Sequence, residues 1–295
     1  MGPQRFLENW TYPMPRHPTE PATPVELVRR HDHDRFLASL FFPADRRAAV
    51  WALLAFNLEV ARVREVVSQP IIGQIRLQWW RDALDEIYTG KPPRRHEVVE
   101  PLAEAIGHHR LTRTHFDTLI DGREFDLGDE PPASLAALES YLEKTSSRLL
   151  YLQLEILGVE APAAFEAARH VGIGWGLVGL ARALPFHAAH GRLYLPADLM
   201  AASGLAREMV LATPGAAAPV VAKLTASARE HLAAARALKA EVPRAATAAL
   251  LLAAPARLHL GRLARAHHDP QAGALQAPDP WAVPRLLLAR QLGPL

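Results

Sequence analysis

The chain contains no cysteine, which excludes disulfide bonds, iron–sulfur clusters, thiolate zinc sites and a cysteine nucleophile. Long apolar runs are missing too. The best candidates, Val171 to Ala181 and Ala245 to Ala254, are far shorter than the roughly 18 to 20 residues that span a bilayer. The first residues lack the pattern of a cleavable signal. We therefore expect a cytoplasmic protein, whose membrane contact, if it has one, is peripheral and at the inner face.

An excess of charge of one sign is also absent. The net charge is +2, the sequence pI is near 9.1, and arginine is spread along the chain without a run of five or more basic residues. This pattern does not indicate a nucleic-acid partner. The series Gly172, Gly174, Gly176 and Gly179 falls within a predicted helix and follows no strand, so it is not a phosphate-binding loop. We expect these glycines to let helices approach closely or to open room for an apolar guest.

Apolar residues recur every three or four positions along most of the chain, and no alternating β-branched run is found. This periodicity predicts an all-α protein with about ten helices. With 295 residues and 49% hydrophobic content, the chain can bury one large core. Prolines gather at the ends, with six in residues 1 to 24 and five after Asp269. We predict an irregular Pro-rich leader over 1–24 and a single helical domain over 25–292.

Capping residues and prolines give the expected boundaries of the helices. Thr23, Pro24 and Glu26 are typical of a helix start. Pro185 is expected to end a helix and Pro255 to kink one. The later helices are expected over 46–67, 72–88, 98–110, 113–127, 134–157, 163–184, 208–212, 216–240 and 244–268.

Two segments carry the main functional signal. The first, 55–65, reads Ala-Phe-Asn-Leu-Glu-Val-Ala-Arg-Val-Arg-Glu, and the second, 172–196, ends in Gly-Arg-Leu-Tyr-Leu-Pro. Residues four apart on a helix share a face, so Ala61 with Glu65, and Ala183 with His187, are expected to project into one cavity. Magnesium prefers carboxylate oxygens, whereas imidazole suits softer metals. With one acid among these four positions, the sequence predicts a poor magnesium site.

These segments, together with Leu77-Gln-Trp-Trp-Arg-Asp-Ala-Leu84 and Leu119-Ile-Asp-Gly122, resemble the squalene/phytoene synthases over roughly residues 25 to 292. In that family, aspartates on two helices hold the magnesium ions that carry a prenyl diphosphate. The family's acids fall on Ala61, Arg62, Glu65, Ala183 and His187 of this chain, while Arg182, Arg192 and Tyr194 match the pattern. The resemblance implies an isoprenoid-synthase-type helical bundle around a central cavity.

Within that superfamily, the run Ala-Phe-Asn-x-Glu-x-Ala-x-Val is most similar to a divergent branch. This branch includes the mitochondrial assembly factor for respiratory complex I, and it also lacks the aspartate pairs. The resemblance implies a non-catalytic assembly or maturation factor without a cofactor. Its partner would be a complex I subunit or assembly intermediate, and its cavity could retain an isoprenoid or lipid ligand.

Two other functions stay open. One is a prenyltransferase that condenses two prenyl diphosphates, with magnesium on a displaced site built from Glu59, Glu65 and Asp121. The other is a carrier that binds an isoprenoid or diphosphate without metal. Guanidinium groups bind phosphate as paired donors, and Arg62, Arg182 and Arg192 could supply them.

Each candidate also has a plain structural interpretation. Glu59, Arg62, Arg64 and Glu65 could form a rewired polar pocket or a solvated helix face, and Arg182 and Arg192 could pair with acids on neighbouring helices. Fourteen histidines give close pairs by chance, so we interpret them as structural or surface residues. A solvated helix face is the expected place for Asp121, Glu124 and Asp126. We expect Trp79 and Trp80 to belong to the core.

Overall fold

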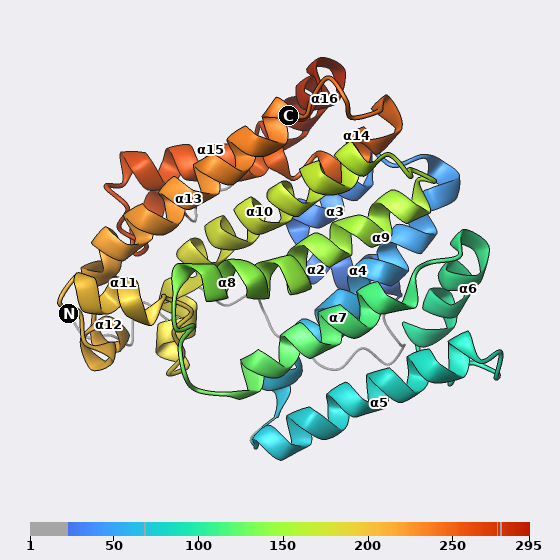
Figure 1. The fold of residues 1–295 in the computed structure, drawn as a ribbon, viewed down its shortest axis with the longest axis horizontal. Helices are drawn as coiled ribbons and strands as arrows, with labels where there is room; N and C mark the ends of the chain where they lie inside the picture. Colours follow the sequence, from blue (N-terminus) through green and yellow to red (C-terminus); the bar gives the residue numbers. More distant parts are fainter. Residues whose placement is uncertain (1–22, 68, 276, 278) are drawn as a thin grey trace.

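The computed structural model describes residues 23–67, 69–275, 277 and 279–295, and α-helices joined by short 3₁₀ turns dominate this part of the chain (Figure 1). The all-α prediction is confirmed, with fifteen α-helices in these residues where about ten were expected. They are α2 Pro24–His31, α3 His33–Ser39, α4 Arg47–Ala61, α5 Pro70–Tyr88, α6 Val99–His109, α7 Arg113–Glu124, α8 Leu135–Leu142, α9 Arg148–Ile156, α10 Pro162–Ala189, α11 Ala197–Ala202, α12 Arg207–Ala212, α13 Ala218–Ala237, α14 Thr247–Leu250, α15 Ala253–Arg265 and α16 Ala282–Leu292.

The predicted start of the first described helix is confirmed at its capping residues. Thr23 is the N-cap of α2 and Pro24 is its first residue. The Glu26 carboxylate accepts hydrogen bonds from the backbone N–H of Thr23 at 2.9 Å and from its hydroxyl at 2.8 Å. The leader predicted for 1–24 lies outside the described residues except for Thr23 and Pro24.

The long helix α10 runs through the middle of the bundle and organises the other helices around it (Figure 1). It packs against α13 and α15 on one side and against α8 and α9 on the other. The helix α4 packs against α2, α6 and α9, while α5 lies at the outer edge against α7. Apolar side chains from most of these helices form one continuous buried core, so the central helices are apolar on nearly all faces.

Glycines on α10 allow the close packing that was expected of them. A Cβ on Gly172 would lie 2.5 Å from the Cα of Ser147, and one on Gly176 would lie 2.5 Å from Cδ2 of Leu142. Gly179 has open space beside it instead. The glycines thus bring α10 against α8 and the following turn, and further along the helix they leave room for a cavity.

The helix predicted over 134–157 is interrupted. Between α8 and α9 the chain forms a π-helical turn over Glu143–Ser147, which packs against α7 and α10. A π turn inserts an extra residue per turn, and such turns are frequent at functional sites. Thr145, Ser146 and Ser147 are buried there, and periodicity alone gave no sign of the change.

Two expectations about proline were wrong. Pro185 does not end its helix, because α10 continues to Ala189 and the added turn buries Ala188. The helix thus tolerates an internal proline, although such a residue costs about 3 kcal/mol. Pro255 does not kink its helix either. The break falls between α14 and α15, and Pro255 is the third residue of α15. The first four N–H groups of a helix have no partner within it, so the missing N–H of proline costs no hydrogen bond there.

The helix that carries the first motif is shorter than predicted. It ends at Ala61, Arg62 is its C-cap, and a 3₁₀ turn covers Val63–Val66. Ala61 and Glu65 are therefore not on one α-helix, and the expectation that they share a face is wrong.

Among the described helices, none combines the length and the apolarity that crossing a membrane requires.

Candidate functional site

A cavity of about 820 Å³ lies against α10, near its second half. Its walls come from α2 and α3, from α8 with the π turn, from α10, and from α15 and α16. Trp175, Gly176, Gly179 and Leu180 contribute apolar surface and open space from α10. The volume is within the range of pockets that bind small molecules and cofactors.

Charged side chains share this cavity with the apolar ones. Three aspartates line it, Asp32, Asp34 and Asp279, together with the five arginines Arg35, Arg123, Arg182, Arg262 and Arg285. Cations therefore outnumber carboxylates along its wall. This balance suits an anionic or neutral ligand better than a divalent metal ion.

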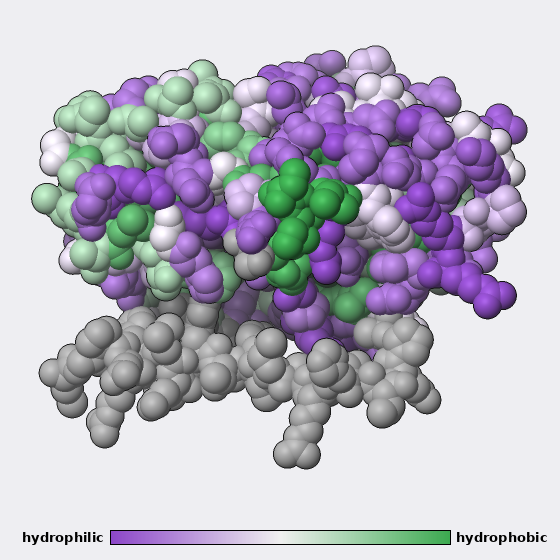
Figure 2. Space-filling view, turned by 90° about the horizontal axis from the view of Figure 1, so that it is seen from below, coloured by the Kyte–Doolittle hydropathy of each residue, from purple (hydrophilic) through white to green (hydrophobic). Residues whose placement is uncertain are grey.

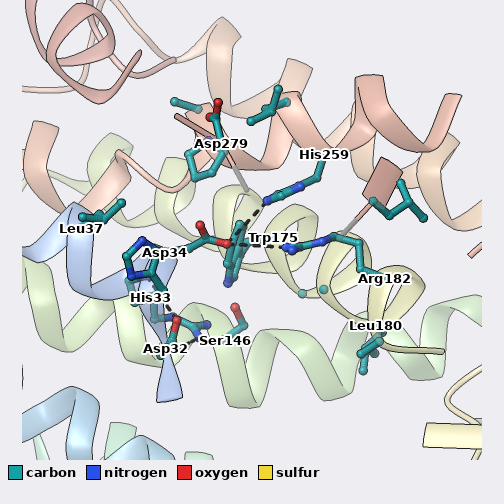
Figure 3. A pocket seen from close by; sticks show the side chains of 18 of the residues that line it. Asp32, His33, Asp34, Leu37, Ser146, Trp175, Leu180, Arg182, His259 and Asp279 are labelled. Carbon is teal, nitrogen blue, oxygen red and sulfur yellow. Dashed lines mark hydrogen bonds and ion pairs between the residues drawn. The ribbon is translucent and has the colours of Figure 1, made fainter. Parts of the chain in front are cut away.

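Asp34 lies between two cationic or hydrogen-bonding partners in the cavity (Figure 3). Its Oδ2 atom is 3.6 Å from Nη1 of Arg182 and 3.5 Å from Nε2 of His259. Burial alone would raise the pKa of the Asp34 carboxyl, but His259 and Arg182 outweigh it and the pKa is lowered. Asp34 is thus a carboxylate that is already engaged by the protein.

The other two acids in the cavity are paired as well. Asp32 accepts a hydrogen bond from the backbone N–H of Arg35 at 3.2 Å, which caps α3, and its Oδ2 is 2.7 Å from Nη1 of Arg35. Oδ2 of Asp279 is 2.6 Å from Nη1 of Arg285. The guanidinium of Arg35 also lies 5.8 Å from the ring centroid of Trp175.

His259 is 5% exposed and thus one of the buried polar residues of the cavity wall. Burial is the main cause that lowers the pKa of the His259 imidazole, and the charge of Arg182 acts in the same direction. Asp34 raises this pKa, but by less. The ring is therefore neutral at pH 7. Its Nε2 faces Asp34, while its Nδ1 is buried and has no hydrogen-bond partner among the described residues. A ligand or water in the cavity could satisfy this atom.

The second motif does reach the cavity, as predicted. Ala183 and His187 both line it, and they stand where the family pattern has acids. Burial, with the charges of Arg192 and His190, lowers the pKa of His187 to about 4. The ring also packs edge-on against Tyr194, with 4.8 Å between centroids. A neutral imidazole therefore occupies a position where a synthase has a carboxylate.

The first motif does not contribute to the lining. Ala61, Arg62 and Glu65 are outside the described residues that line the cavity, and Nε of Arg62 pairs with Oε2 of Glu65 at 3.3 Å. Burial and the charge of Arg62 lower the pKa of His31, so Arg62 lies close to this wall of the cavity without forming it. Glu59 is half-buried on α4.

The three arginines that were considered together as an anion site are not brought together in the lining. Of Arg62, Arg182 and Arg192, only Arg182 lines the cavity, and it pairs with Asp34. Arg192 donates a hydrogen bond to the backbone carbonyl of Asp126. The plainer interpretation, pairing with an acid on a neighbouring helix, holds for Arg182, whereas the partner of Arg192 is a backbone carbonyl.

Asp126 was expected on a solvated face, and this was wrong. Its buried Oδ1 accepts hydrogen bonds from the hydroxyls of Tyr141 and Tyr194, both at 2.8 Å, and its Oδ2 is 3.3 Å from Nη1 of Arg123. Burial and the neighbouring carboxylate raise the pKa of both tyrosines. Since Arg123 and Tyr141 line the cavity, this network supports its wall.

Asp121 and Glu124 are on the solvated face that was predicted. Nη2 of Arg81 lies 2.7 Å from a carboxylate oxygen of each, and both acids are more than half exposed. In the described residues, no group of three or more histidine, aspartate or glutamate side chains is placed to hold a metal ion. The displaced site suggested for Glu59, Glu65 and Asp121 is therefore not formed.

The aromatic prediction holds for Trp80, which is buried and meets Phe56 edge-on at 5.1 Å. Trp79 is partly exposed and stacks under Arg94.

Sequence reasoning missed Asp34 and His259. The dense run His31-Asp-His-Asp-Arg35, at a break between two helices, was a usable signal for Asp34. We find no comparable signal for His259, which lies in an apolar repeat.

Comparisons with known proteins agree with this geometry. The sequence model described as "Squalene/phytoene synthase" matches residues 28–281. The chain is similar to "NADH dehydrogenase (ubiquinone) complex I, assembly factor 6" of Bos taurus, with 37% identity over 229 residues, 77% of this chain and 68% of that protein. It is 28% identical over 212 residues to "Presqualene diphosphate synthase" of Rhodopseudomonas palustris, which is 71% of this chain and 75% of that protein.

A solved structure, that of a dehydrosqualene synthase in complex with ligand, superposes with a TM-score of 0.77 at 18% identity. The superposition covers 91% of this chain and 94% of that one. At this identity the likeness confirms the fold, the helical bundle of the squalene/phytoene synthases.

Proposed function

This chain belongs to the squalene/phytoene synthase family, and on this basis we propose that it is a non-catalytic assembly or maturation factor for respiratory complex I, the NADH:ubiquinone oxidoreductase. The observation that carries the proposal is the 37% identity, over 77% of the chain, to a protein named for that role. The synthase relative is more distant, at 28% identity. We place the protein at the cytoplasmic face of the respiratory membrane, where a complex I subunit or assembly intermediate would be its partner.

The donor set of the cavity supports a role without prenyl transfer. Magnesium needs several oxygen ligands that are free to coordinate it. Asp32, Asp34 and Asp279 are each paired with an arginine, and the positions of the family's acids hold an alanine and a neutral histidine in the second motif. Releasing an aspartate to a metal would leave a partly buried guanidinium without its counter-ion, which costs free energy. The residues present do not fit a diphosphate-bound magnesium cluster.

An exposed apolar patch beside the first motif is a candidate surface for the partner subunit. Val66, Ile71, Ile72 and Ile75 are 52%, 55%, 40% and 62% exposed; Val66 ends the 3₁₀ turn before α5, and the three isoleucines lie in its first turns. Figure 2 shows this patch as the strongly hydrophobic cluster near the middle of the face that it presents. Large apolar side chains gathered in this way are typical of protein interaction sites. We propose that the complex I partner docks here.

A deletion strain of the organism that encodes the chain tests the assembly role. We expect reduced NADH:ubiquinone activity and less intact complex I on native gels, with restoration by the wild-type gene. The double variant Ile71→Ser/Ile75→Ser should fold normally and fail to restore activity, whereas Met209→Ser, which changes a 49% exposed side chain elsewhere, should restore it. Normal complex I in the deletion strain, combined with the loss of an isoprenoid product, would contradict the proposal.

The second candidate is a carrier that binds an isoprenoid or another apolar ligand in the cavity without metal. The cavity volume of about 820 Å³ and the unpartnered Nδ1 of His259 favour it. Binding of farnesyl diphosphate that persists in EDTA would support this function, because only a magnesium-bridged complex needs the ion. Binding that requires magnesium would favour the prenyltransferase instead.

A further inference from the structure

The helix α16 leaves most of its surface uncovered. Of its eleven residues, Ala282 to Leu292, only Leu286 is buried. Trp281, Val283, Leu287, Leu288 and Leu292 are 63%, 44%, 49%, 55% and 65% exposed. These exposed side chains are all large and apolar, so α16 carries an apolar surface that the fold leaves open to the surroundings.

The spacing of these residues places them on one broad stripe. Trp281, Leu288 and Leu292 are separated by seven and four positions, and therefore lie above one another on the helix. Leu287 continues the stripe around the helix. At about 100° per residue, Arg285 borders one edge of the stripe and Arg290 the other. The result is a mainly apolar face, interrupted by the exposed Gln291, with a guanidinium along each side.

The surroundings of α16 are positively charged. From Arg236 to Leu295 the chain has eight arginine or lysine and three acidic residues, a net charge of +5, whereas the whole chain has +2. Two of these cations lie at the far end of α16, where Nζ of Lys239 donates to the carbonyl of Leu292 at 2.7 Å and Arg257 donates to that of Pro294. Only one of the three acids, Asp279, pairs with a cation of the helix itself, Arg285.

We propose that α16 is a membrane-docking helix that lies on an anionic lipid surface. An exposed apolar stripe with a tryptophan, edged by arginines, has the composition of helices that rest in the interface with their apolar face toward the acyl chains. Arginine and lysine near the surface add attraction to acidic lipid headgroups. The contact is peripheral, and it does not depend on the assembly role proposed above.

The opposite side of α16 faces the cavity. Ala282 and Leu286 line it, and so do Asp279 and Arg285 at the start of the helix. One helix thus separates the lipid surface from the cavity. Docking through α16 would bring the cavity wall against the membrane, where an apolar ligand is available.

Flotation with lipid vesicles tests this proposal on the full chain. Wild-type protein should float with vesicles made of an equimolar mixture of phosphatidylcholine and phosphatidylglycerol, and much less with pure phosphatidylcholine. The variant Leu288→Ser/Leu292→Ser should lower the partition coefficient by about tenfold or more. Arg290→Gln should reduce the preference for phosphatidylglycerol while retaining part of the binding.

The matched control is Ile71→Ser/Ile75→Ser, since these two residues are exposed to the same degree, 55% and 62%, on the other apolar patch. This control should float like the wild type. Failure of the wild type to float, or an equal loss in both double variants, would overturn the proposal. A further outcome is that the wild type forms dimers and does not bind vesicles, and that Leu288→Ser/Leu292→Ser makes it monomeric. This result would assign the apolar face to a second copy of the chain and would also overturn the proposal.

Discussion

Replacing His187 changes how stability depends on pH, and the size of the change follows from its environment. Burial lowers the pKa of this imidazole from 6.5 to about 4 in the folded chain. The unfolded chain therefore binds a proton between these two values that the folded chain does not. Because proton binding then favours unfolding, the stability that His187 contributes is complete above pH 6.5 and is lost as the pH falls toward 4.

The expected magnitude is about 2 kcal/mol between pH 7 and pH 5, since the two states differ by up to one proton over that range. His187→Gln keeps a polar side chain of similar size and removes the titration. Urea unfolding followed by circular dichroism at both pH values should show that the variant loses about 2 kcal/mol less than the wild type. The difference between the two proteins cancels the contributions of the other histidines.

His108→Gln is the control, because it replaces an exposed imidazole on another helix, α6, whose charge does not act on His187. It should follow the wild-type curve. Parallel curves for the wild type and His187→Gln would refute the reasoning, because they would mean that position 187 takes up its proton equally in both states. In that case the imidazole would keep its ordinary pKa of 6.5 in the folded chain and would become charged in the cavity below that pH.

Three further changes test the packing around the cavity, each by urea unfolding. Asp126→Ala should destabilise the fold by about 3 to 5 kcal/mol, since it leaves the guanidinium of Arg123 without its carboxylate; a loss under about 1 kcal/mol would contradict the network. Gly172→Ala should cost about 1 to 3 kcal/mol because the new methyl would lie 2.5 Å from the Cα of Ser147. Gly179→Ala, on the same helix, meets open space and should be neutral or stabilising by up to about 1 kcal/mol, so equal losses at the two glycines would refute this account.

The sequence predicted the fold better than the site, for a physical reason. Apolar periodicity and capping residues such as Thr23 and Glu26 are local, and they identified the helices. The end of α4 at Ala61 depends on how the 3₁₀ turn packs, so the face of Glu65 was placed wrongly. Pro185 misled because tertiary packing along α10 overrides the local preference of proline, and that packing is not visible in the local sequence.

The site itself is made of contacts between distant segments. Asp34 and His259 lie more than two hundred positions apart, and nothing in either local sequence points to the other. Asp126 was assigned to the solvated face of its acidic neighbours, yet Tyr141 and Tyr194 bury it. His187 and Ala183 were placed in the cavity correctly, because the family motif carries positional information that composition does not.

The central claim is that the carboxylates of the cavity are committed to arginines and cannot assemble a magnesium cluster. The direct test is a turnover assay of the purified chain with radiolabelled farnesyl or geranylgeranyl diphosphate and magnesium, run beside an active squalene/phytoene synthase. We predict no condensed isoprenoid product above the background without protein. A product that forms at an enzymatic rate, and disappears with Asp34→Ala, would contradict the claim.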